Sequence, residues 1–84
     1  MNNTQVEKIV SYSRSFGWIS QREAYRLGIY RLASRISDMK RAGYRIMTEY
    51  ARVENADGTS SRIARYKVIA TPYEVIHNDT MEAN

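Results

Sequence analysis

Residues 20–43 constrain the fold most, because they carry two helix patterns with almost nothing between them. Ser20 and Glu23 have the spacing of a capping box, which predicts that a helix begins there. The pattern stops at Gly28, a residue type that favours a helix end, and Ile29 is left for the turn. A short turn containing glycine holds two helices at a steep angle.

The second helix is predicted to run from Tyr30 or Arg31 to Ala42, with Gly43 as its stop. Steps of about 100° per residue divide it into two faces. The apolar face holds Leu32, Ile36, Met39 and the stem of Lys40. The opposite, polar face holds Arg31, Ser34, Asp38 and Arg41, and its flanks hold Tyr30, Arg35 and Ser37. The helix therefore has one side for the core and one basic side that the core cannot accept.

After Gly43 the hydrophobic period changes from that of a helix to that of a strand. Residues 44–54 and 61–69 are rich in β-branched and aromatic residues, and the sequence NADGT between them is a turn signal. These features predict a β-hairpin.

One register of this hairpin gives it an apolar inner face, with the pairs Ile46–Val68, Thr48–Tyr66 and Tyr50–Ala64. It also sets Glu49 opposite Arg65, an opposite-charge pair that favours the register. Arg52 falls opposite Arg62, and like charges across a ladder are unfavourable. Two interpretations stay open. Either the two arginines bind an anion between them, or their side chains point apart into water.

Before the paired helices, residues 5–16 form an amphipathic helix pattern, and Trp18-Ile19 is predicted to add a short strand. Helix, strand, two helices and hairpin is the element order of a winged helix-turn-helix. The predicted fold is therefore α+β, with three helices and a C-terminal β-hairpin wing. We expect the domain to cover residues 1–69, and residues 70–84 to form an acidic tail that is a short helix or partly disordered.

The charge is unevenly distributed along the chain. Residues 22–69 carry eleven Lys and Arg against five Asp and Glu, whereas residues 70–84 carry three acids and no Lys or Arg. A basic domain favours a polyanionic partner, although solubility alone is the simpler explanation. The polar N-terminus and the lack of a long apolar run predict a cytoplasmic protein without a membrane partner.

Four stretches within residues 19–69 resemble the small helix-turn-helix proteins of phages and prophages. They are SQREA at 20–24, GIYRLASRI at 28–36, GYRI at 43–46 and ARYKV at 64–68. The resemblance implies double-stranded DNA as the partner and the host cytoplasm or nucleoid as the location. In one departure, the apolar pair Ala33 and Ile36 falls one position earlier than in repressors, which predicts a shorter turn.

The predicted DNA-binding residues are Arg22, Tyr30, Arg31, Ser34, Arg35, Lys40, Arg41, Arg45, Arg52 and Arg62. Arg31 and Arg35 are expected to meet guanine edges. Lys40, Arg41, Arg45 and Arg22 suit phosphates, which position a protein without specifying a sequence. The wing arginines suit a minor groove. The alternative for Arg31 and Arg35 is a solvated helix face, with Arg35 paired to Asp38.

Three aromatic residues are expected in the core instead of at a binding site: Trp18, Tyr50 and Tyr66. Catalysis finds little support, because the single histidine, His77, lies in the acidic tail and the chain has no cysteine. The sequence contains no glycine-rich phosphate loop and no cluster of metal ligands. We therefore expect a protein that is not an enzyme and has no cofactor or metal.

Three function classes follow. The favoured one is a phage or prophage transcriptional regulator that inserts its third helix into the major groove. The alternatives are an excisionase-like architectural DNA binder and a protein-binding winged helix that inhibits a host factor. A homodimer and a protein partner both stay open.

Overall fold

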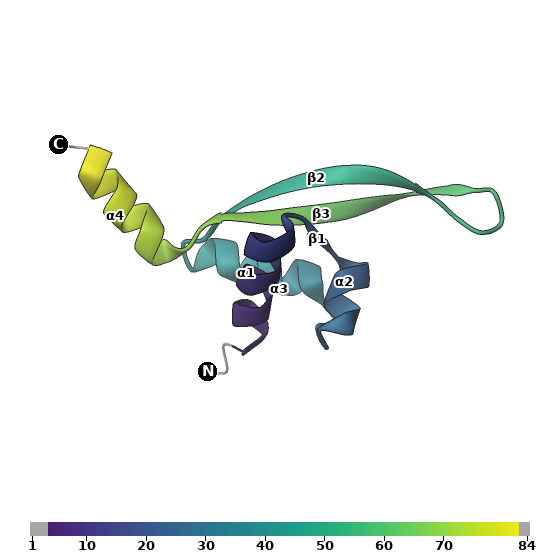
Figure 1. The fold of residues 1–84 in the computed structure, drawn as a ribbon, viewed down its shortest axis with the longest axis horizontal. Coiled ribbons are helices and arrows are strands. Elements are labelled where there is room, and N and C mark those ends of the chain that lie inside the picture. The colour runs from purple at the N-terminus through teal and green to yellow at the C-terminus, as the bar shows by residue number, and fades with distance from the viewer. Residues whose placement is uncertain (1–3, 83–84) are drawn as a thin grey trace.

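The computed structural model describes residues 4–82 and has the predicted order of elements. The elements are α1 (Thr4–Phe16), β1 (Ile19–Ser20), α2 (Gln21–Arg26), α3 (Leu32–Arg41), β2 (Arg45–Glu54), β3 (Ser60–Ala70) and α4 (Pro72–Glu82). The strands form one antiparallel sheet in the order β1-β3-β2. Helices α1, α2 and α3 lie on one side of the sheet, the hairpin tip projects past them at one end, and α4 extends from the other (Figure 1). The predicted winged helix-turn-helix fold is confirmed.

The core forms where the three helices meet the base of the hairpin. It consists of Ile9, Ile19, Ala24, Ile29, Leu32, Ile36, Met39 and Val68. The predicted apolar face of α3 is confirmed, since Leu32, Ile36 and Met39 are each at most 2% exposed. Lys40 is exposed as a whole residue, and the place of its stem on this face stays a prediction.

The connection between α2 and α3 spans residues 27–31 and is longer than predicted. Gly28 adopts a φ of +82°, and the N–H of Ile29 donates to the carbonyl of Ala24 at 2.8 Å. The N–H of Gly28 donates to Tyr25 at 3.0 Å, which completes a Schellman motif that turns the chain out of α2. Ile29 then enters the core, where it is 0% exposed.

Helix α3 begins at Leu32, so the prediction that Tyr30 or Arg31 starts it is wrong. Arg31 occupies the N-cap with φ −129° and ψ 69°, which is not helical geometry. Ile29 is buried, the chain bends at Tyr30, and the helix begins after Arg31.

The side chain of Gln21 connects α2 to the turn and to α3. Its Nε2 donates to the carbonyl of Ile29 at 2.8 Å, and its Oε1 accepts the N–H of Leu32 at 2.9 Å. The N–H groups of the first helical turn have no partner within the helix. Because the N-cap Arg31 makes no side-chain cap, Gln21 satisfies one of these groups from a distance.

Ser13 holds α1 against the sheet. Its hydroxyl accepts the N–H of Val68 at 2.9 Å and donates to the carbonyl of Gly17 at 2.8 Å, and the residue is 3% exposed. A buried N–H without a partner is costly. The Ser13 hydroxyl therefore joins α1 to β3, and it also supplies a partner to the carbonyl of Gly17 just after α1.

The hairpin register is confirmed, including Glu49 opposite Arg65 and Arg52 opposite Arg62. The apolar inner face is shorter than predicted. Thr48 is exposed and Tyr50 is 61% exposed, because the hairpin extends past the helices that cover its base. The prediction that Tyr50 belongs to the core is therefore wrong, whereas Tyr66 packs against the core as expected.

The short strand begins at Ile19, one residue later than predicted, and ends at Ser20. Ser20 is extended (φ −114°, ψ 175°), so one residue both ends the strand and caps α2. Trp18 is half-buried and lies outside the core cluster, with its ring near the charged ends of Arg65 and Lys67.

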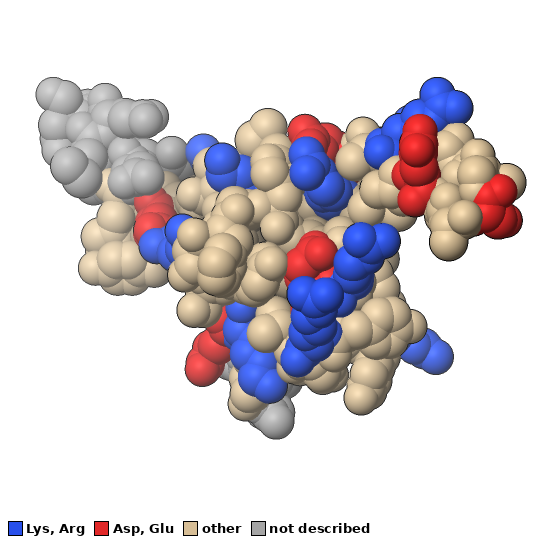
Figure 2. Space-filling view, turned by 45° about the vertical axis from the view of Figure 1, so that its right-hand side comes forward, with Lys and Arg blue, Asp and Glu red and all other residues tan. Residues whose placement is uncertain are grey.

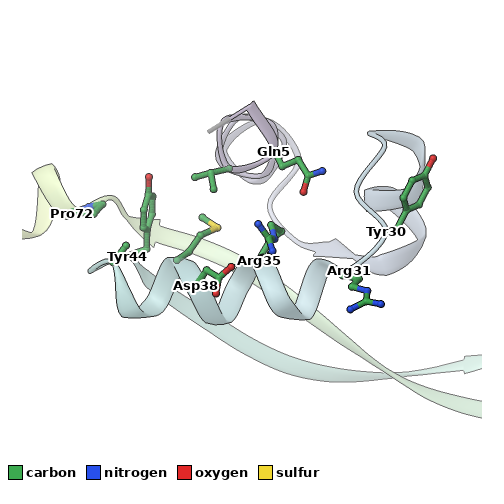
Figure 3. A pocket seen from close by; sticks show the side chains of 10 residues that line it. Gln5, Tyr30, Arg31, Arg35, Asp38, Tyr44 and Pro72 are labelled. Carbon is green, nitrogen blue, oxygen red and sulfur yellow. Dashed lines mark ion pairs between the residues drawn. The ribbon is translucent and has the colours of Figure 1, made fainter. Parts of the chain in front are cut away.

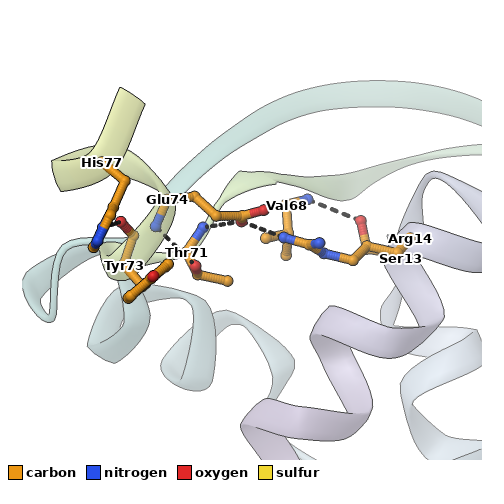
Figure 4. A network of polar contacts seen from close by, with 7 residues as sticks. All are labelled: Ser13, Arg14, Val68, Thr71, Tyr73, Glu74 and His77. Atoms are coloured by element: carbon orange, nitrogen blue, oxygen red, sulfur yellow. Dashed lines mark hydrogen bonds and ion pairs between the residues drawn. The ribbon is translucent and has the colours of Figure 1, made fainter. Parts of the chain in front are cut away.

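Residues 72–82, within the segment predicted as a tail, form α4. The N–H of Thr71 donates to Glu74 at 2.8 Å, and Arg14 of α1 forms an ion pair with the same carboxylate (Figure 4). The Thr71 hydrogen bond and then Arg14 lower the pKa of Glu74. The boundary between a domain at 1–69 and a tail at 70–84 stays a prediction.

We predict that Gln21→Ala destabilises the protein by about 1–3 kcal/mol, because the Leu32 N–H and the Ile29 carbonyl lose their partner. Gln21→Glu should remain destabilised, since a carboxylate can accept from Leu32 but cannot donate to Ile29. Chemical denaturation at neutral pH measures both variants. Gln5→Ala, on the exposed side of α1, is the control, and equal stability of Gln21→Ala and Gln5→Ala would contradict the proposed connection.

A second prediction concerns pH. Partial burial raises the pKa of Glu23, but hydrogen bonds from the Ser20 hydroxyl and N–H outweigh it and hold the pKa below the ordinary 4.5. A lowered pKa in the folded state means that the ionised group contributes stability above pH 4.5. Denaturation at several pH values should therefore show that Glu23→Gln costs most near neutrality and progressively less as the pH falls below this value. A cost independent of pH would contradict it.

Candidate nucleic-acid interface

The outward side of α3 is small and polar. Its exposed residues are Ala33, Ser34, Ser37, Lys40 and Arg41. Short side chains along a helix allow the backbone to approach a base edge closely, and a major groove about 12 Å wide admits such a helix. Ser34 and Arg41 therefore lie where the sequence predicted them.

Arg31 and Arg35 lie on a different flank of α3 from the one predicted. Together with Tyr30 and Gln5 they line a groove of about 700 Å³ between α3 and the start of α1. Arg35 extends from α3 toward α1, while Arg31 lies at the beginning of the helix (Figure 3). The contact of both arginines with DNA stays a prediction.

Tyr30 lies before α3 and is 69% exposed. Its ring packs against Tyr25 of α2, with the centroids 5.6 Å apart. Tyr30 thus packs on the end of α2, and its predicted contact with DNA stays a prediction.

Asp38 lies between two arginines of α3. Its Oδ1 is 2.6 Å from Nη2 of Arg41, and its Oδ2 is 3.3 Å from Nη2 of Arg35. Arg35 lies three residues before Asp38, and Arg41 lies three residues after it. Pairing of Arg35 with Asp38, which the sequence offered as an alternative, is confirmed.

The inner face of the wing presents cations on the same side of the sheet as α3. The guanidinium of Arg62 lies over the ring of Tyr50, 4.7 Å from its centroid, and Nε of Arg52 donates to Ser60 at 3.1 Å. Each arginine thus turns to a neighbour on the facing strand, and this arrangement moderates the repulsion between them. Tyr50 is an interface candidate that the sequence did not reveal, because its alternation matches that of core residues.

A smaller hollow of about 300 Å³ separates the helices from the wing. Arg22 of α2 and Ala33 of α3 line one side of it, and Ala64 and Tyr66 of β3 line the other. Arg22 is exposed at the first turn of α2, as its predicted phosphate contact requires. The hollow therefore lies between helices α2 and α3 on one side and strand β3 on the other.

Lys40 and Arg45 are exposed near the point where α3 passes into β2. Lys40 Nζ lies 3.5 Å from Oγ1 of Thr48, which is long for a hydrogen bond. Lysine and arginine side chains extend over both the helical body and the projecting hairpin (Figure 2). Their contact with DNA stays a prediction.

The outer face of the sheet differs from this surface. Arg65 pairs with Glu49 across the hairpin and, like Lys67, lies near the Trp18 ring. Met47 and Ile69 are about half exposed, at 53% and 48%. This face is mixed in charge and partly apolar, so it suits a polyanion less well than the inner face of the wing does.

Within residues 4–82, no group of three His, Cys, Asp or Glu side chains is placed to hold a metal ion. The helices of this part of the chain are too short and too polar to cross a bilayer.

Comparison with known proteins identifies the fold family. The winged helix-turn-helix domain family matches residues 4–72, and the chain belongs to it. This membership supports DNA binding. Searches of curated proteins and of solved structures each found no significant match.

We predict that Arg62→Ala weakens binding to duplex DNA by roughly 1 kcal/mol while leaving thermal stability nearly unchanged, since an exposed cation would lose a phosphate. Tyr50→Ala should likewise weaken binding and retain the fold. Lys67→Ala, which removes the same charge from the outer face, is the matched control and should bind as the wild type does. Titrations of a labelled duplex measure all three. Equal losses for Arg62→Ala and Lys67→Ala would show that only net charge matters.

Proposed function

We propose that this chain is a sequence-specific transcriptional regulator of phage or prophage origin. In this proposal α3 enters the major groove of double-stranded DNA, the wing contacts the adjacent backbone or minor groove, and Arg22 contacts a flanking phosphate. The observation that carries it is that α2 and α3 share a hollow with β3, the strand that also carries Arg62 over the ring of Tyr50.

The composition of α3 supports the reading of DNA bases by the outward face of this helix. Ser34 and Ser37 occupy its outward face, and Arg31 lies at its start. Serine bonds to several base edges, and arginine forms two hydrogen bonds to guanine. A helix that gripped only the backbone would need cations along its whole outward face, whereas here they lie at its edges and its end.

Selection of bound DNA from a random pool tests the function directly. A single preferred motif supports a regulator, whereas a tandem or bent array favours the architectural alternative. Absence of any enrichment would contradict DNA recognition and favour a protein-binding winged helix.

A matched pair of variants separates reading of bases from positioning on the backbone. Arg31→Ala should cost about 1–3 kcal/mol on the selected duplex and relax preference at one base position. Arg41→Ala should weaken binding to selected and scrambled duplexes alike and reduce the salt slope by about one. Affinities measured on both duplexes at several salt concentrations check these outcomes. Equal losses on both duplexes for Arg31→Ala would assign that side chain to the backbone.

A further inference from the structure

Helix α4 presents an apolar face to solvent. Tyr73 and Ile76 are 69% and 64% exposed, and because they are three residues apart they lie on one side of the helix. None of the described side chains of α4 belongs to the core cluster. A helix of eleven residues gains most of its stability by packing such a face against another element.

Contacts at its first turn fix the direction of α4. The N–H of Thr71 donates to Glu74 at 2.8 Å, and Arg14 of α1 pairs with the same carboxylate (Figure 4). Held in this way, the helix extends from the end of the sheet, beyond the strands (Figure 1). It therefore leaves the outer face of its own sheet uncovered.

That outer face carries a second exposed apolar patch. Met47 of β2 and Ile69 of β3 are 53% and 48% exposed. Met47 lies opposite Lys67, and Ile69 follows Lys67 by two residues on the same face of the sheet. Met47 and Ile69 are thus diagonal neighbours across the ladder, within reach of each other. The half-buried ring of Trp18, near Lys67, extends the patch.

The helix and the patch are complementary in charge. Residues 72–82 contain three acids and no Lys or Arg. On the outer face Arg65 is paired with Glu49, which leaves the exposed cation Lys67 in excess. Two acidic α4 helices would repel each other, whereas α4 on the outer face brings opposite charges together. A single exposed charge contributes little, so apolar contacts supply the affinity and the charges select the arrangement.

One chain thus carries both halves of a contact, an acidic apolar helix and a cationic apolar sheet face. When two chains exchange these contacts, the contact forms twice about a two-fold axis and the assembly closes. The doubling matters, because α4 is only about 16 Å long and a stable interface buries at least about 1,200 Å² in total.

We propose that this chain forms a homodimer in which α4 of each copy packs on the outer face of the other copy's sheet. Helices α1, α2 and α3 lie on the opposite side of the sheet and stay free. The inference goes beyond the proposed function and does not depend on it, since its test requires no DNA.

Sedimentation of the full chain over a range of concentrations measures the association. We expect a dimer that Ile76→Asp and Met47→Asp each weaken by about tenfold or more, because a carboxylate enters the apolar contact. Tyr30→Asp is the matched control, since Tyr30 is 69% exposed but lies just before α3, on the other side of the sheet. Thermal unfolding establishes that each variant is folded. A monomer at every concentration, or equal losses for all three variants, would overturn the proposal.

Cross-linking establishes which surfaces meet. The chain has no cysteine, so Ile76→Cys and Met47→Cys each introduce a single thiol. When the two variants are mixed and re-equilibrated, a short bifunctional maleimide should join one to the other, and should join either variant to itself far less. Dominant self-linking of Ile76→Cys would show two α4 helices side by side, and that of Met47→Cys two outer faces in contact. Either result, or no link between the mixed variants, would overturn the arrangement.

Discussion

The geometry of the binding surface depends on the carboxamide of Gln21. It bonds the turn at Ile29 and the first N–H of α3 at Leu32, and so determines where α3 begins relative to α2. The turn residues on either side of this contact are held by independent means. Gly28 ends α2 with a positive φ, and Ile29 is fully buried. An amide that both donates and accepts is needed, because one of its partners is a carbonyl and the other an N–H.

With the start of α3 held by Gln21, contacts of α1 and the sheet position the wing relative to α3. Ser13 joins α1 to β3 through Val68, and the sheet carries the hairpin out beyond the helices. The cations on the resulting surface are restrained by local partners: Arg62 by Tyr50, Arg52 by Ser60, and Arg41 by Asp38. Each contact is weak at an exposed site. Together they reduce the conformational freedom that these long side chains would lose on binding.

The sequence predicted those parts of the fold in which one local pattern decides the outcome. The alternation of apolar and polar residues, together with the Glu49–Arg65 pair, was sufficient to predict the hairpin register. Helical spacing of apolar residues was sufficient to predict the buried face of α3. The predicted start of α3 was wrong because the start depends on Ile29 entering the core and on the side chain of Gln21, eleven residues before Leu32. Neither contact leaves a periodic signal.

The candidate site was harder to predict than the fold. Tyr50 alternates like a core residue, and only the length of the hairpin beyond the helices shows that nothing covers it. Arg35 was placed beside the polar face from its helical angle alone. Its actual surroundings, the groove against α1, depend on how two helices pack, which residue spacing within one helix does not contain.

The central claim is that the outward face of α3 lies against the DNA, and protection of a single thiol tests it most directly. The chain has no cysteine, so Ser37→Cys on the outward face of α3 and Ser15→Cys on exposed α1 each introduce one reactive group. Alkylation rates are compared with and without the selected duplex. We predict that the duplex slows alkylation at position 37 by about tenfold or more and leaves position 15 unaffected. Protection at position 15 with none at position 37 would contradict the account.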